Sequence, residues 1–282
     1  MNALDIKNLS KTYTDFSLDS ISLSLPIGSI IGLVGENGAG KSTTIRLIMN
    51  AISRTSGEIS VLGTDNQSPD FNKVKEDIGI VLDEAYFPEV LNAKNINTIM
   101  KNTYKNWDET CYLDYLKKFS LPDKKAIKDF SRGMKMKLAI AVALSHNPKL
   151  LILDEATSGL DPIIRDEILD IFNDFTRDES HSVLLSSHIV SDLEKICDYI
   201  AFLHKGKLIF CEEKDKLLEE YSIVRLTKKE FEAIPSSSVR GKKVTDYGIE
   251  ALIQRNPALK QLKTERTSIE DIILFLAKGE KN

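Results

Sequence analysis

A glycine-rich segment near the start of the chain, residues 35–42, matches a phosphate-binding loop. It reads Gly-Glu-Asn-Gly-Ala-Gly-Lys-Ser and fits the pattern G-x-x-x-x-G-K-[ST] at every fixed position. Glycine allows the backbone to curl until successive N–H groups point at phosphate oxygens, and the positive end of a following helix adds to that attraction. Lys41 would then reach the β- and γ-phosphates, and Ser42 would offer its hydroxyl to Mg²⁺. The residues expected to bind the nucleotide here are Gly35, Asn37, Gly38, Ala39, Gly40, Lys41, Ser42 and Thr43.

The segments on either side of this loop have the patterns that a phosphate loop requires. Residues 29–34 form an apolar run that predicts a buried strand, and residues 42–49 predict the helix that follows. The alternative is a glycine-rich turn with a chance lysine. Because strand, loop and helix are all in place, we favour a nucleotide site.

Strands and helices alternate along the rest of the chain, which is typical of an α/β fold. Residues 4–9 and 20–25 alternate apolar and polar side chains, as strands with one solvated face do. Residues 150–155 instead form a continuous apolar run that ends in two carboxylates, as in a strand of a parallel sheet covered on both faces. Further strands are expected at residues 59–63, 78–82, 183–185, 199–203 and 207–210, the last two as a hairpin.

Helical periodicity replaces the strand pattern between about residues 90 and 146. It is interrupted by Pro122 and resumes at residues 135–144. The pattern predicts an inserted helical subdomain at about residues 88–147. Asp161 followed by proline predicts the start of another helix, with the aspartate as its cap.

The tail is expected to be a small accessory domain, residues 221–282, after a main domain of residues 1–220. Ser268 and Asp271 resemble a capping pair for a last helix. Its apolar stripe could dock on the main domain, on a second copy or on a membrane surface, and we expect docking within the protein. The stripe consists of Ile269, Ile272, Ile273 and Leu276.

Composition and charge limit the class of protein. The chain is 42% hydrophobic and 28% charged, as in globular proteins, and no apolar run approaches the roughly 20 residues of a membrane span. The amino terminus lacks the layout of a secretion signal, so we expect a cytoplasmic protein. A net charge of −4 argues against nucleic acid as a main partner, because duplex binding needs a basic face. Three cysteines without a C-x-x-C spacing suit reduced thiols.

Three further motifs follow the phosphate loop. Residues 130–134 read Phe-Ser-Arg-Gly-Met and open a helix, residues 158–161 read Ser-Gly-Leu-Asp, and His188 follows a strand. Together with the loop and the carboxylate strand, they resemble the nucleotide-binding subunit of an ABC transporter over about residues 4–210. The resemblance implies an α/β fold: a P-loop NTPase core with a mainly parallel sheet, an antiparallel β subdomain, the inserted helical subdomain and a small C-terminal extension.

ATP hydrolysis with ATP and Mg²⁺ as cofactors is the activity that the resemblance implies. Asp154 would hold Mg²⁺, because a hard cation prefers carboxylate oxygen. Glu155 would be the general base toward the attacking water, and His188 would contact the γ-phosphate, with Lys41 as the third catalytic residue. The alternatives are a solvated strand end for the carboxylates and a structural role for a lone histidine. Tyr13 could lie against the adenine, although packing on the sheet would explain it equally well.

The motif at Ser131 implies a second subunit. Ser131 and Gly133 would close over an ATP molecule held by another subunit, and Asp161 is also expected to contact nucleotide. Two ATP molecules would then lie in a head-to-tail dimer that hydrolysis loosens. The resemblance leaves open whether the dimer is a homodimer or a heterodimer.

Two motifs depart from the family pattern. Asp83 stands where glutamine is usual, and a carboxylate can reach Mg²⁺ or water but cannot donate a hydrogen bond. Arg132 and Met134 replace the glycine and glutamine of the signature. Variants of this kind resemble one-domain ATPases that serve bacterial exporters of drugs, peptides or lipids.

Our main hypothesis is therefore an ATPase subunit that drives export through a separate membrane permease, peripheral on the cytoplasmic face of the cell membrane. Residues 83–90 and the helical subdomain would form the contact with the permease. One alternative is a soluble ABC ATPase acting in translation or chromosome maintenance, but the chain has a single phosphate loop and no heptads. A phosphate-loop kinase is a further alternative, in which Ser131 and Asp161 would have no role. The cargo stays open, because the permease selects it.

Overall fold

A six-stranded sheet forms the centre of the computed structural model, which describes residues 1–83, 87–246, 248–256, 259 and 261–279. Its strand order is β10-β9-β3-β8-β7-β6. The first five strands in sequence run parallel and the last is antiparallel to its neighbour, so the mainly parallel sheet predicted from the sequence is confirmed. The strands are β3 (Ile30–Val34), β6 (Ile78–Val81), β7 (Leu150–Asp154), β8 (Ser182–Ser187), β9 (Tyr199–His204) and β10 (Lys207–Glu213).

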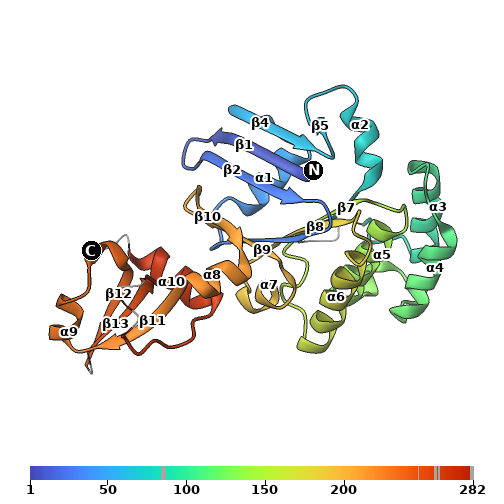
Figure 1. Cartoon of the computed structure of the whole chain (residues 1–282). Coiled ribbons are helices and arrows are strands. Elements are labelled where there is room, and N and C mark those ends of the chain that lie inside the picture. Colours follow the sequence, from blue (N-terminus) through green and yellow to red (C-terminus); the bar gives the residue numbers. More distant parts are fainter. Residues whose placement is uncertain (84–86, 247, 257–258, 260, 280–282) are drawn as a thin grey trace.

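A second, antiparallel sheet has the order β2-β1-β4-β5 and lies above the central sheet in Figure 1, with α1 (Lys41–Ile48) between them. The alternating pattern of β2 buries Ile21, Leu23 and Leu25 on one face. These side chains share a core with α1 and with the near face of the central sheet, so the two sheets hold the phosphate loop between them. The strands are β1 (Asn2–Thr12), β2 (Ser17–Pro26), β4 (Ser56–Val61) and β5 (Thr64–Asp65).

The helical insert lies between β6 and β7 in the chain and forms the right-hand side of the molecule in Figure 1. Asn92 and Asp108 cap its first two long helices by accepting hydrogen bonds from backbone N–H groups. Tyr112 is fully buried at its centre and donates its hydroxyl to the carbonyl of Ala93. The predicted helical subdomain is present, with a break around Pro122. Its elements are α3 (Ala93–Thr103), α4 (Glu109–Lys118), η2 (Ile127–Asp129) and α5 (Arg132–Leu144), whereas the short α2 (Phe71–Val74) and η1 (Lys75–Asp77) precede β6.

Three helices follow the strands of the second half of the central sheet. The start of α6 (Pro162–Phe175) matches the prediction, because Asp161 accepts hydrogen bonds from the N–H groups of Ile163 and Ile164. After it come α7 (Val190–Ile196) and α8 (Lys214–Glu220). No helix among the described residues is long and apolar enough to cross a bilayer.

The tail contains a three-stranded antiparallel sheet of order β11-β13-β12, which the sequence patterns did not predict. Val224, Ala251 and Ile253 form a small core of its own. A 3-10 turn stands where a loop was expected at residues 235–238. The elements are β11 (Tyr221–Leu226), α9 (Lys228–Glu232), η3 (Ser236–Ser238), β12 (Val239–Thr245) and β13 (Gly248–Gln254).

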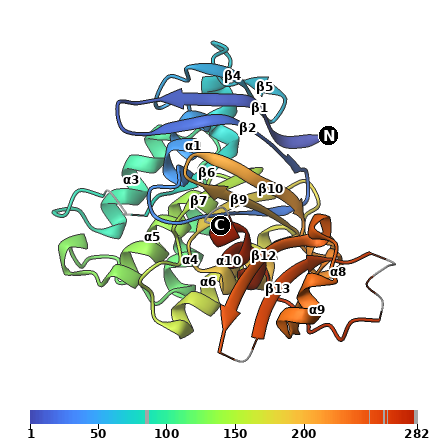
Figure 2. The ribbon, with the colours of Figure 1, turned by 90° about the vertical axis from the view of Figure 1, so that its left-hand side faces the viewer.

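The last helix, α10 (Ile269–Gly279), returns to the main part of the chain. The predicted capping pair forms, since Ser268 and Asp271 exchange side chain to backbone hydrogen bonds. Figures 1 and 2 both place α10 between the tail sheet and the main body. Its apolar stripe joins the core that contains Leu193, Phe202 and Leu217, so the expected docking within the protein is confirmed.

Candidate nucleotide site

The glycine-rich loop joins β3 to α1 at the carboxyl edge of the central sheet, in a conformation that depends on its glycines. Gly38 and Gly40 have φ angles of 83° and 114°, which side chains with a Cβ rarely adopt. A Cβ on Gly35 would lie 2.3 Å from the carbonyl oxygen of Leu203. Gly40 precedes α1 without any side-chain cap in the described chain, so the first N–H groups of that helix can bind an anion.

Lys41 is buried beneath this loop with only 5% of its side chain exposed. Its ammonium donates to the carbonyl oxygen of Gly35 at 2.7 Å and to that of Glu36 at 3.3 Å. It also pairs with Glu155 Oε1 at 3.1 Å. A buried charge must be paired, and these partners place the ammonium at the floor of the loop, where phosphate oxygens could replace the carbonyls.

Asp154 and Ser186 form the second part of the site, because parallel pairing of β7 with β8 sets them side by side. Asp154 is 4% exposed, so the alternative of a solvated strand end does not hold for it. Ser186 Oγ donates to Asp154 Oδ1 at 2.5 Å. Sequence patterns assigned no role to this serine, because its partner lies on a strand 32 positions away.

Glu155 turns away from the strand and connects two of the other predicted catalytic residues. Its φ angle is 51°, an unusual conformation for a residue with a side chain, and its N–H binds the carbonyl and hydroxyl oxygens of Ser186. Oε1 faces Lys41 and Oε2 lies 2.6 Å from Nδ1 of His188. The fold therefore brings together Lys41, Glu155 and His188 from three separate segments.

The residues predicted to hold Mg²⁺ fit that cation by their chemistry. Asp83 lies two residues after the end of β6, the neighbour of β7, so it lies at the same sheet edge as Asp154. Ser42 is half-buried in the first turn of α1 and offers a hydroxyl. The described residues contain no group of three His, Cys, Asp or Glu that would form a complete metal cage. In Mg²⁺–nucleotide sites in general, phosphates and waters supply most ligands and the protein one or two.

The predicted adenine contact, Tyr13, lies in the turn between β1 and β2. Its N–H binds the carbonyl oxygen of Phe16, and Phe16 packs so closely on Gly40 that a Cβ there would be 3.0 Å from its ring. This contact brings the turn next to the phosphate loop. Tyr13 is 45% exposed, and the ammonium of Lys11 lies 5.1 Å from the centre of its ring.

Ser131, Gly133 and Asp161 form a separate group. Ser131 caps α5 by accepting from Met134 N–H, and Arg132 packs over Gly159. Gly133 is buried against α6, where a Cβ on it would lie 3.0 Å from Ile164. In the described ranges, no hydrogen bond or ion pair joins this group to Lys41, Glu155 or His188.

Arg165 and Asp192 are further residues that the sequence patterns missed. Arg165 donates to the carbonyl oxygen of Leu160, next to Asp161, and lies 3.9 Å from the buried carboxylate of Asp192. This pair connects the segment before α6 with α7, which follows His188. The Arg165–Asp192 pair depends on the packing of α6 on α7, so the sequence alone did not indicate it.

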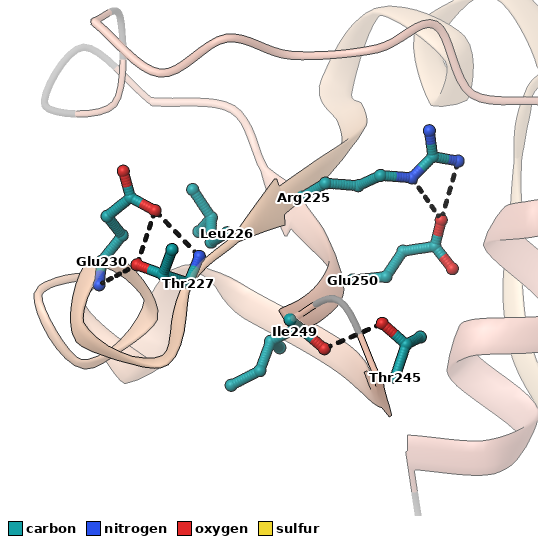
Figure 3. A pocket seen from close by; sticks show the side chains of 8 residues that line it. Arg225, Leu226, Thr227, Glu230, Thr245, Ile249 and Glu250 are labelled. Carbon is teal, nitrogen blue, oxygen red and sulfur yellow. Dashed lines mark hydrogen bonds and ion pairs between the residues drawn. The ribbon is translucent and has the colours of Figure 1, made fainter.

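A hollow in the tail, shown in Figure 3, lies apart from these residues. Its charged groups are already engaged: Arg225 pairs with Glu250 and Glu265, and Glu230 accepts from Thr227 in a capping box. Because these groups satisfy one another, the hollow shows no chemistry of a binding site.

The site consists of a strand, a glycine loop and a helix that bury a lysine, with two carboxylates at the end of a nearby strand. This combination defines a phosphate-loop nucleotide-binding ATPase. The family model described as "ABC transporter" matches residues 18–158. A lantibiotic transport ATP-binding protein of Streptococcus pyogenes is 38% identical over 75% of this chain and 91% of its own length. A bacitracin transport ATP-binding protein of Bacillus licheniformis is 35% identical over 72% of this chain and 67% of its own length.

Solved structures agree with these relatives. One described as an ATP-binding subunit of an ABC transporter is 28% identical, with a TM-score of 0.69, over 77% of this chain and 92% of its own. An ATP-binding cassette solved as a dimer with ADP and phosphate shares the fold at 23% identity, with a TM-score of 0.67, over 74% of this chain and 98% of its own. The chain belongs to the ABC transporter family, as an ATP-binding subunit that hydrolyses ATP. These relatives support the transporter subunit over a soluble ATPase of translation or chromosome maintenance.

Proposed function

We propose that Glu155 is the general base of ATP hydrolysis and that Lys41 and His188 hold the γ-phosphate. The observation that carries this proposal is the position of Glu155, with one oxygen on the Lys41 ammonium and the other on the His188 ring. A carboxylate so held is oriented for accepting a proton from water near the γ-phosphate. The ammonium stabilises the charge that develops on the phosphoryl oxygens.

Asp154, Ser42 and Asp83 would hold the Mg²⁺ that accompanies ATP. Bound there, the cation neutralises negative charge on the phosphates. The hydrogen bond from Ser186 fixes the Asp154 carboxylate in one orientation and leaves its second oxygen for the cation or its water. The N–H groups of the loop bind the phosphates, and Tyr13 stacks on the adenine.

Ser131 and Asp161 act on the ATP of a second subunit in this proposal. Both cap helices, and among the described residues no hydrogen bond or ion pair joins them to the chain's own Lys41, Glu155 and His188. A two-fold related copy would bring that surface onto the phosphate loop and produce two composite sites. The dimeric cassette with the same fold supports such an arrangement, and we propose a homodimer, since each copy carries a complete set of predicted catalytic residues.

The energy of dimer closure would drive a separate permease that exports a peptide-like substrate from the cytoplasmic side of the membrane. Support comes from the names of the relatives, which are a lantibiotic and a bacitracin transport protein. The proposed permease contact comprises residues 83–90 and the helical insert. Residues 84–86 lie outside the described part of the chain, and Val90, 83% exposed, offers apolar surface there.

The test is Glu155→Gln, which keeps the size of the side chain and removes the base. We expect ATP turnover to fall by at least about a hundredfold while ATP binding persists and an ATP-bound dimer accumulates. Glu179→Gln, an exposed position before β8 at the opposite edge of the sheet, is the matched control and should hydrolyse ATP normally. Unchanged turnover in Glu155→Gln would remove this residue from the mechanism.

A further inference from the structure

A cavity of about 380 Å³ lies between the phosphate loop and α10. Asn37 and His188, two residues of the proposed ATP site, line one side of it. Ile273 and Leu274 of α10 line the other side, and the buried ring of Phe202 lies between. The C-terminal helix, which lies outside the residues that the family model matches, therefore borders the nucleotide site.

An apolar side chain is exposed on the surface that the proposed dimer brings toward this cavity. Ile163 is 82% exposed, although it stands in the first turn of α6. Its N–H donates to the Asp161 carboxylate at 3.2 Å, so the two residues belong to the same capped helix start. An isoleucine held in water loses the free energy that its burial would provide.

We propose that Ile163 of a second copy of this chain inserts into the cavity, so that α10 forms part of the ATP-dependent dimer interface. The inference rests on the proposed head-to-tail dimer, in which Asp161 of one copy lies at the phosphate loop of the other. Ile163 is two residues further on, within about 7 Å of chain. Asn37 and His188 belong to both the ATP site and the cavity, so the two sites adjoin. An Asp161 of the second copy that lies at the ATP site therefore brings its Ile163 to the cavity.

The two surfaces are complementary in polarity and in charge. Insertion of Ile163 would also cover Leu274, which is 45% exposed. Glu36 and Glu270 line the cavity, whereas Arg132 lies on the opposite surface, packed over Gly159. Opposite charges around an apolar centre favour contact of the Ile163 surface with the cavity over contact of two Ile163 surfaces or of two cavities. By two-fold symmetry the contact would form twice per dimer.

The experiment measures the ATP-dependent dimer of the purified chain in the Glu155→Gln background by sedimentation equilibrium. We expect Ile163→Asp and Leu274→Asp each to weaken this dimer at least about tenfold, because a charge would enter an apolar contact. Val244→Asp, the same kind of change at a 73% exposed tail position, is the control and should dimerise normally. ATP binding to the monomers and their circular dichroism should be unchanged, since both side chains lie at the surface.

Cross-linking locates the contact directly. Ile163→Cys and Leu274→Cys chains, with Cys111 and Cys211 replaced by serine, are mixed with ATP, Mg²⁺ and a short bis-maleimide. We expect a covalent dimer in the mixture with ATP and none without it. If Glu155→Gln dimerises with ATP while the cross-link is missing and Leu274→Asp dimerises normally, this inference is overturned and the proposed function stands. If Glu155→Gln gives no ATP-dependent dimer, the proposed dimer itself fails.

Discussion

Replacing Ser186 with alanine tests how the fold prepares Asp154. The Ser186 hydroxyl donates to the Asp154 carboxylate at 2.5 Å, and both side chains are buried. The substitution leaves a buried carboxylate oxygen without this donor and makes no large cavity. A hydrogen bond to a charged group contributes about 1.5–3 kcal/mol and a neutral one about 1 kcal/mol. Because the Ser186 hydroxyl also accepts from Glu155 N–H, we expect the free energy of unfolding to fall by about 3 kcal/mol.

Ser182 offers a matched control on the same strand. It is equally buried, but its hydroxyl exchanges hydrogen bonds with the neutral backbone of Pro26 and Gly28 at 3.4 and 3.1 Å. Neutral hydrogen bonds contribute about 1 kcal/mol each, so Ser182→Ala should cost about 2 kcal/mol, which is less than the cost of Ser186→Ala. Urea unfolding followed through Trp107, the one tryptophan of the chain, gives both values.

A functional measurement on the same variant separates positioning from stability. If Ser186 orients Asp154 toward Mg²⁺, Ser186→Ala should need a higher Mg²⁺ concentration for half-maximal ATPase activity, while Ser182→Ala should match the unsubstituted protein. Equal losses of stability in the two variants, together with equal Mg²⁺ requirements, would refute the importance assigned to this hydrogen bond.

Two further predictions concern buried groups. Lys41→Ala should weaken ATP binding at least about tenfold, because phosphate oxygens lose a charge-assisted donor. Lys73→Ala, which removes one partner of an exposed surface ion pair, should leave ATP binding unchanged. Titration with a fluorescent ATP analogue measures the affinity of both variants. Burial lowers the pKa of His146, so the folded protein binds this proton less readily than the unfolded chain, and stability should fall as the pH drops below about 6.5. His146→Phe, which keeps the ring stack on Tyr104, should lose less stability between pH 7 and 5 in urea unfolding, and an identical loss would contradict this origin.

Local sequence signals were sufficient for the phosphate loop and most of the central fold. The run before the loop is a buried strand because every residue of β3 is apolar or glycine, and α1 begins where the glycines end. Asp161 and Ser268 cap helices as expected, because capping depends on residues within one turn. The tail strands were missed, and β12 has the weakest pattern of them, because two valines are its only apolar side chains and they lie among charges.

Contacts between distant segments needed the fold. Ser186 lies beside Asp154 through strand pairing, and Arg165 meets Asp192 through helix packing, with no signal in either local sequence. The burial of Gly133 against Ile164 likewise depends on how α5 meets α6. Such contacts arise from the order of strands in the sheet, which a single sequence leaves open.

The sequence by itself determined that this chain binds nucleotide phosphates, because the glycines, the lysine and the flanking elements are one continuous segment with its own backbone requirements. It also determined the two strand-end carboxylates as candidates for chemistry. The tertiary structure decided that Glu155 connects Lys41 to His188 and that α10 returns to the edge of the nucleotide site. The physical reason is that local backbone preferences act over a few residues, whereas the placement of a side chain beside a remote one depends on how whole sheets and helices bury their apolar faces.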